Sequence, residues 1–135
     1  MKIVVFACVH NAGRSQMAAA FFNALADPRK ARAISAGTHP AERVHPEVVE
    51  AMKEAGVDLS KAVPALLTKE RAEGAGLLVT MGCGEECPVI PGARREDWPI
   101  EDPRSRSPER VREIRDEIRG RIVRLITESG WSKKP

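Results

Sequence analysis

A thiol and a guanidinium flank a short loop of small residues near the start of the chain. The stretch FACVHNAGRSQMA places Cys8 directly after an apolar run and Arg14 directly before a run with helical spacing. Cysteine is a strong nucleophile as a thiolate, and the arginine guanidinium is a charged planar fork that matches two oxygens of a tetrahedral anion. The Cys-x5-Arg spacing between a strand and a helix therefore predicts covalent catalysis on phosphate or a phosphate-like anion.

The residues between this cysteine and arginine favour a backbone that curls around an anion. They are Val9, His10, Asn11, Ala12 and Gly13. Such a loop would point several amide hydrogens into one concavity, with the positive end of the next helix behind it. The same field favours thiolate over thiol, so we expect Cys8 to be nucleophilic, with Ser15 donating a hydrogen bond to its sulfur. The alternative interpretation is a buried cysteine in a glycine-containing turn, with Arg14 at the surface.

Length and composition limit what this loop can belong to. The 135 residues fit one domain, spanning 1–135, and 42% hydrophobic with 30% charged residues is typical of a soluble globular protein. The apolar run after Met1 has only about six residues, too few for a secretion signal or a membrane span. We therefore expect a cytoplasmic protein with no membrane partner. Thiols stay reduced in the cytoplasm. The three cysteines are therefore better interpreted as reactive or metal-binding groups than as structural disulfides.

The positive net charge does not indicate a nucleic-acid partner. The chain carries +3 with a pI near 9.0, and its basic residues are densest between Arg104 and Arg124. Acidic residues are interleaved with them, which is typical of a solvated helix face. These acids are Glu109, Glu113, Asp116 and Glu117. With no Tyr, three Phe and two Trp, the sequence also lacks the aromatic side chains that stack on single-stranded bases.

Strand patterns alternate with helix patterns along the chain. The expected strands cover 2–7, 31–37, 77–82 and, more weakly, 93–99; the expected helices cover about 15–26, 45–56, 69–75 and 108–129. Alternation of this kind predicts an α/β protein with a parallel sheet and helices on both faces. Ligands bind beyond the carboxyl ends of such strands. Cys8 and Cys83 each lie at such an end, so neighbouring strands would bring the two sulfurs together.

Five stretches resemble the thioredoxin-coupled arsenate reductases, which share the low-molecular-weight protein tyrosine phosphatase fold. They are CVHNAGRSQMA, SAGT, HPEVVEAMKEAGVDLS, LVTMGCGEECP and REDWPIEDP. The resemblance covers nearly the whole chain and implies a three-layer α/β sandwich whose four-stranded parallel sheet has the order 2-1-3-4. It also implies that Asp102, stiffened by Pro103, is the general acid that protonates the leaving oxygen. Considered alone, an Asp-Pro pair is more often an acidic residue in a surface turn.

The resemblance also assigns roles to the two later cysteines. In the family scheme the loop cysteine, Cys8, attacks arsenate, and Cys83 releases arsenite by forming a disulfide with it. Cys87 then attacks that disulfide, and thioredoxin reduces the final bond between Cys83 and Cys87. Gly82 and Gly84 flank the middle cysteine and would let the segment move between partners.

Two other interpretations of the Cys-x3-Cys spacing remain open, namely a metal half-site and two inert or regulatory thiols. A zinc site needs a second pair of ligands, and His10, His39 and His45 are neither paired nor spaced like one. We therefore predict no metal and no cofactor, with catalysis carried by protein side chains alone.

The external reductant and the class of reaction have alternatives. The stretch HNAGRSQMA also resembles reductases that use a small thiol such as mycothiol, so either thioredoxin or a low-molecular-weight thiol fits. The alternative function is a low-molecular-weight protein tyrosine phosphatase that hydrolyses phosphate monoesters. Tyrosine phosphatases tend to place an aromatic residue after Asp-Pro, where this chain has Arg104. We therefore predict a monomeric arsenate reductase that also binds phosphate or sulfate as mimics, with weak ester hydrolysis.

Overall fold

The computed structural model describes residues 1–82 and 89–133 and contains one parallel sheet. Its strands are β1 (Lys2–Cys8), β2 (Ala31–Gly37), β3 (Leu77–Thr80) and β4 (Arg94–Asp97). The strand order is β2-β1-β3-β4, and all three pairings are parallel, which confirms the predicted topology. Cys8 pairs with Gly37 and Ala7 pairs with Thr80, so three strands end at the same edge of the sheet.

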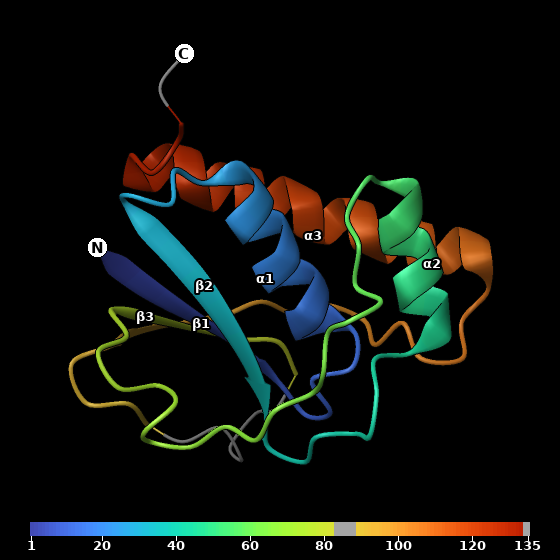
Figure 1. The fold of residues 1–135 in the computed structure, drawn as a ribbon, viewed down its shortest axis with the longest axis horizontal. Helices are drawn as coiled ribbons and strands as arrows, with labels where there is room; N and C mark the ends of the chain where they lie inside the picture. Colours follow the sequence, from blue (N-terminus) through green and yellow to red (C-terminus); the bar gives the residue numbers. More distant parts are fainter. Residues whose placement is uncertain (83–88, 134–135) are drawn as a thin grey trace.

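Three helices cover one face of this sheet (Figure 1). They are α1 (Arg14–Leu25), α2 (Pro46–Glu54) and α3 (Pro108–Ser129). In Figure 1, α1 lies between β2 and α3, while α2 packs beside α3 further from the sheet. None of the helices in the described part of the chain is long and apolar enough to cross a membrane.

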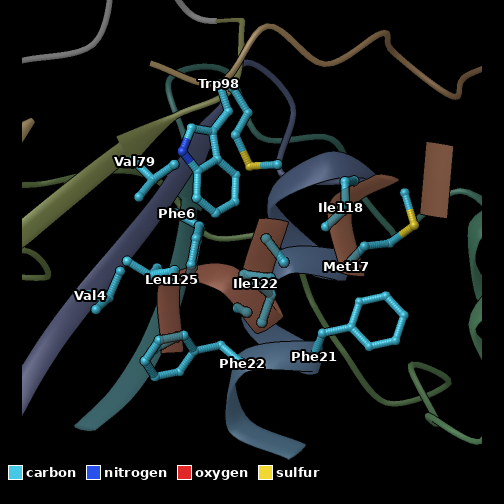
Figure 2. Close-up of a cluster of buried hydrophobic side chains, with 14 of the residues drawn as sticks. Val4, Phe6, Met17, Phe21, Phe22, Val79, Trp98, Ile118, Ile122 and Leu125 are labelled. Atoms are coloured by element: carbon cyan, nitrogen blue, oxygen red, sulfur yellow. The ribbon is translucent and has the colours of Figure 1, made fainter. Parts of the chain in front are cut away.

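The apolar run of β1 is explained by burial on both faces. Val4 and Phe6 point toward the helices, where Phe6 packs against Phe22 and Trp98 with ring centroids 6.0 and 5.7 Å apart (Figure 2). Val5 and Ala7 belong to a second cluster on the opposite face. A strand that is buried between two apolar layers does not need polar residues to alternate with apolar ones, and the β1 sequence shows no such alternation.

The long last helix begins and ends at the predicted residues. The Ser107 side chain accepts a hydrogen bond from the Arg110 N–H, Pro108 occupies the first turn, and Gly130 ends the helix with φ of +74°. Its buried residues are Val111, Ile114, Ile118, Ile122, Leu125 and Ile126. Their spacing of three and four forms the stripe that packs on α1 and the sheet.

The helix predicted over residues 69–75 is wrong, because this segment is a series of turns. Thr68 starts it by accepting hydrogen bonds from Arg71 N through its hydroxyl and from Ala72 N through its carbonyl. Gly74 ends it after one turn with φ of +83°. Ala72 and Ala75 are nevertheless buried against the second face of the sheet. The third layer of the sandwich is therefore made of turns, which Figure 1 shows in green and yellow below the sheet.

Candidate active site

The loop between β1 and α1 turns its carbonyl groups toward the surrounding protein. The carbonyls of Cys8, Val9 and His10 accept hydrogen bonds from the backbone N–H groups of Thr38 (3.2 Å), His39 (2.7 Å) and Ala41 (3.0 Å). Those of Ala12 and Gly13 accept from the N–H groups of His45 and Met17, both at 2.9 Å. The Asn11 carbonyl accepts from Gln16 Nε2 at 3.1 Å. A trans peptide directs each following N–H the opposite way. Within the described part of the chain, the N–H groups of residues 9–13 have no acceptor. We infer a concavity lined by amide donors, the arrangement that binds anions.

The nucleophile candidate lies at the base of this concavity and carries an ordered hydrogen bond. Cys8 is the last residue of β1, is 2% exposed, and has its Sγ 2.8 Å from Ser15 Oγ. Asn11 Nδ2 donates to the same hydroxyl oxygen at 2.7 Å. Because that oxygen accepts from Asn11, its own hydrogen is free to point at sulfur. When Cys8 is a thiolate it carries no hydrogen, and the serine hydroxyl is then the donor to sulfur.

The side chain of Asn11 is oriented so that its amide group donates to Ser15. Its Oδ1 accepts from the Ala65 N–H at 2.9 Å and from Gln16 Nε2 at 3.1 Å, which leaves its amide group as the donor to Ser15. Asn11 is fully buried with φ of +48°, a left-handed conformation that asparagine tolerates better than most residues. Sequence reasoning placed Asn11 in the loop but missed the role of its side chain and of Gln16.

Arg14 is the last residue of the anion loop, which comprises residues 8–14. It joins this loop to the loop that carries Asp102. Its Nη1 donates to the Ile100 carbonyl at 3.2 Å, and its Nη2 lies 3.8 Å from Asp102 Oδ2. The arginine side chain is 11% exposed and the aspartate side chain 41% exposed. The structure thus places a guanidinium close to a solvent-accessible carboxyl group.

Three glycines allow other segments to approach this site closely. A methyl group on Gly13 would come 2.9 Å from Pro103 Cγ, and one on Gly37 would come 2.7 Å from the Val9 carbonyl oxygen. One on Gly82, whose φ is +100°, would collide with the Arg14 guanidinium. Sequence reasoning treated these glycines only as flexible positions. Their contacts join residues far apart in the sequence, so no local signal could have revealed them.

The histidines lie around the loop without forming a metal site. His10 Nδ1 is 3.0 Å from the His39 carbonyl, and His45 directly precedes α2. Burial lowers the pKa of His45, although the carboxylates of Glu47 and Asp102 act in the opposite direction. Among the described residues, no group of three or more His, Cys, Asp or Glu side chains could hold a metal ion.

Cys83 and Cys87, the two remaining predicted site residues, lie outside the described residues. The chain that leads to them can still be followed. β3 ends at Thr80 beside β1, and the backbone of Gly82 lies against the Arg14 side chain. The residue before Cys83 is therefore in contact with the anion loop.

Comparison with known families agrees with this geometry. The family model described as "Low molecular weight phosphotyrosine protein phosphatase" matches residues 3–133. The chain belongs to this low-molecular-weight phosphatase family. Membership agrees with the four-stranded parallel sheet described above.

Relatives within this phosphatase family include proteins named as reductases. A Halobacterium salinarum protein, provisionally named an arsenate reductase, is 41% identical over 127 residues, which cover 91% of this chain and 89% of that protein. A Synechocystis protein named glutaredoxin arsenate reductase is 33% identical over 131 residues, covering 95% and 98%. The structure of a Corynebacterium glutamicum thioredoxin-dependent arsenate reductase superposes with a TM-score of 0.82 at 40% identity. That match covers 95% of this chain but spans only 61% of the corynebacterial chain.

Proposed function

We propose that this chain reduces arsenate to arsenite by covalent catalysis at Cys8. The observation that carries the proposal is the hydrogen bond between Ser15 Oγ and Cys8 Sγ, at the start of an amide-lined loop, in which the hydroxyl is the donor to a Cys8 thiolate. A donated hydrogen bond stabilises sulfur as a thiolate, which is the nucleophilic form. The names of the relatives favour arsenate over a phosphate ester as the substrate.

The first step joins sulfur to arsenic. The loop amides and the Arg14 guanidinium hold arsenate through charge-assisted hydrogen bonds, with the arsenic facing Cys8. The thiolate attacks arsenic, a sulfur–arsenic bond forms, and an arsenic–oxygen bond breaks. Asp102 gives its proton to the departing oxygen, which leaves as water. The distance of 3.8 Å between Arg14 Nη2 and Asp102 Oδ2 supports both groups acting on one bound anion.

The following steps transfer two electrons from thiols to arsenic. The Cys83 thiolate attacks the Cys8 sulfur, and the electron pair of the broken sulfur–arsenic bond stays on arsenic, which leaves as arsenite. Cys87 then attacks Cys83, releasing Cys8 and leaving a Cys83–Cys87 disulfide. Thioredoxin or a low-molecular-weight thiol supplies two electrons to reduce that bond. The contact between Gly82 and Arg14 supports this route, because it brings the chain before Cys83 to the anion loop.

We further propose that the enzyme acts as a monomer in the cytoplasm. All its proposed catalytic groups come from one chain, and a relay through free thiols needs a reducing compartment.

The alternative function is hydrolysis of phosphate monoesters, which the family match favours. Phosphate would bind as arsenate does, and water rather than Cys83 would attack the intermediate on Cys8. Arg104, an exposed residue, follows the Asp-Pro pair where a tyrosine phosphatase would use an aromatic ring. We therefore expect weak hydrolysis of simple esters and no preference for phosphotyrosine.

A coupled assay tests the reductase proposal. Wild-type protein with arsenate should consume NADPH through thioredoxin and its reductase, or through a small thiol and its own reductase. Cys87→Ser should complete about one round of arsenite release but lose repeated turnover, because the disulfide between Cys8 and Cys83 cannot be passed on. Turnover equal to wild type would exclude the relay. Cys8→Ser should lose both reduction and ester hydrolysis, whereas Cys83→Ser should keep hydrolysis.

A further inference from the structure

Backbone strain marks two loops of this protein. Among the described residues other than glycine, only Asn11 and Ser105 have positive φ, of +48° and +59°. Asn11 lies in the anion loop, and Ser105 follows the proposed general acid by three positions. A non-glycine residue keeps such a conformation only when its surroundings hold it there. The contacts of Asn11 come from its own buried side chain, but Ser105 is exposed and must be held in another way.

The group that holds Ser105 is a carboxylate from a different element. Glu47 Oε2 accepts a hydrogen bond from the Ser105 N–H at 3.1 Å. Glu47 lies in the first turn of α2, beside the segment that leads into α3 (Figure 1). Within that segment Asp102 Oδ1 accepts from the Arg104 N–H at 3.0 Å, which closes a tight turn. Glu47 therefore binds the far end of the turn that carries the Asp102 side chain.

The same turn of α2 is also joined to the anion loop. The His45 N–H donates to the Ala12 carbonyl at 2.9 Å. Val48 Cγ2 and Pro103 Cγ both approach Gly13, at 3.6 and 2.9 Å from the point where a β-carbon would lie. The start of α2 thus contacts both the loop that holds the anion and the loop that holds the acid. A side chain that fixes the second loop to this turn sets the position of the carboxyl group relative to the anion.

We propose that Glu47 is a positioning residue that places the Asp102 carboxyl group for proton transfer. The inference rests on the proposed function, in which Asp102 is the general acid. Glu47 acts through the Ser105 backbone and does not touch the anion. Losing its carboxylate frees the turn around Ser105, and Asp102 then spends less time within reach of the departing oxygen. Anion binding is unaffected, because the loop carbonyls and Arg14 keep their own partners.

The test compares Glu47→Ala with Glu47→Gln and with Glu50→Ala. Glutamine keeps an oxygen that can accept from Ser105, while Glu50 is an exposed glutamate on the same helix with no partner among the described residues. For each variant we would measure arsenate turnover, the phosphate dissociation constant, and the hydrolysis of aryl phosphates that differ in leaving-group pKa. Asp102→Asn serves as the reference for loss of the acid.

We expect Glu47→Ala to lower kcat for arsenate about tenfold and leave phosphate affinity within about twofold, since a placed acid is worth roughly a hundredfold or more. Hydrolysis should fall most for esters with poor leaving groups, which need a proton most. Glu47→Gln should recover most of the rate, and Glu50→Ala should match wild type.

Several results would overturn the inference. An unchanged kcat in Glu47→Ala would show that the turn holds without Glu47. An equal loss of phosphate affinity would show that the residue supports the anion loop and not the acid. If the rate loss in Asp102→Asn did not depend on the pKa of the leaving group, the proposed acid and this inference would fail together. If the rate loss depended on it in Asp102→Asn but not in Glu47→Ala, the inference alone would fail.

Discussion

At the residue scale, the site depends on the direction of a few hydrogen bonds. Ala65 and Gln16 saturate the oxygen of Asn11, Asn11 donates to Ser15, and the Ser15 hydrogen is available to a Cys8 thiolate. The side chains of Cys8, Asn11, Ser15 and Gln16 are buried, and burial makes each bond stronger and its loss more costly. We therefore expect residues that do not touch the substrate to set the reactivity of the sulfur.

Removing the serine hydroxyl tests this chain directly. Ser15→Ala should lower the rate of arsenite release in a single turnover by about 10- to 100-fold, because a hydrogen bond to a charged group is worth about 1.5–3 kcal/mol. Phosphate affinity should change little, since the loop amides remain. Quenched-flow measurement of arsenite with Ser60→Ala, an exposed serine, as control would check it. An unchanged rate would show that the hydroxyl does not assist the thiolate.

Sequence reasoning found the residues of this site better than their contacts. The order strand, Cys-x5-Arg, helix is local, so it identified Cys8, Arg14 and Ser15 and their common location. The side-chain role of Asn11 depends on Ala65, 54 positions away, and no periodicity reports such a contact. The Asp102 carboxyl group was found through a family resemblance, because an Asp-Pro pair is common in surface turns.

At the scale of elements, the site is built where a strand end, a helix start and two later segments meet. Gly37, Gly13 and Gly82 are the points at which these segments touch the anion loop. Each contact is closer than a β-carbon permits. The glycines therefore serve packing between segments as well as turning of the chain.

Substitution of Gly82 separates these two roles. Gly82→Ala and Gly92→Ala each force alanine to a positive φ, of +100° and +84°, and each should lower the free energy of unfolding by about 1–2 kcal/mol. Only the methyl group at Gly82 meets the Arg14 guanidinium, whereas that at Gly92 has open space. Phosphate affinity, measured by calorimetry, should therefore fall about tenfold in Gly82→Ala alone. Equal affinity in the two variants would contradict this contact.

Elements with strong local signals were predicted well. The helix Pro108–Ser129 combines a serine cap, a proline in its first turn and a terminal glycine with a buried stripe, and all four signals agree. The segment 69–75 has helix-forming composition, yet Thr68 and Gly74 limit it to turns. Its alanines pack against the second face of the sheet, and the composition of the segment does not reveal this contact.

At the scale of the whole molecule, ion pairs join α2 to α3 and couple stability to pH. Glu54 accepts two hydrogen bonds from Arg112, at 2.9 and 3.0 Å, and one from Arg115 at 3.3 Å. The hydrogen bonds from Arg112 lower the pKa of Glu54 below its ordinary 4.5, with burial acting against them. The unfolded chain therefore binds more protons than the folded one as the pH falls, so this contribution is complete above the ordinary pKa and is lost below it.

Urea unfolding at a series of pH values checks this coupling. The free energy of unfolding should decline between about pH 5 and about pH 3, and Glu54→Gln should show a smaller decline together with lower stability at neutral pH. Glu128→Gln, which removes an exposed pair with Arg124, is the matched control and should change little. If the free energy of unfolding declined as much in the Glu54 variant as in wild type, groups other than Glu54 would be the cause of the acid sensitivity.

The outward-facing carbonyls of the anion loop have a consequence for selectivity. Since the surrounding segments already hold every peptide of the loop in place, we expect binding to need little rearrangement and the loop to accept tetrahedral dianions of suitable size with similar affinity. Inorganic phosphate, abundant in cells, is then a competitor that arsenate must displace. The enzyme then discriminates between arsenate and phosphate at the later electron-transfer step, because thiols can reduce arsenic(V) but not phosphorus(V).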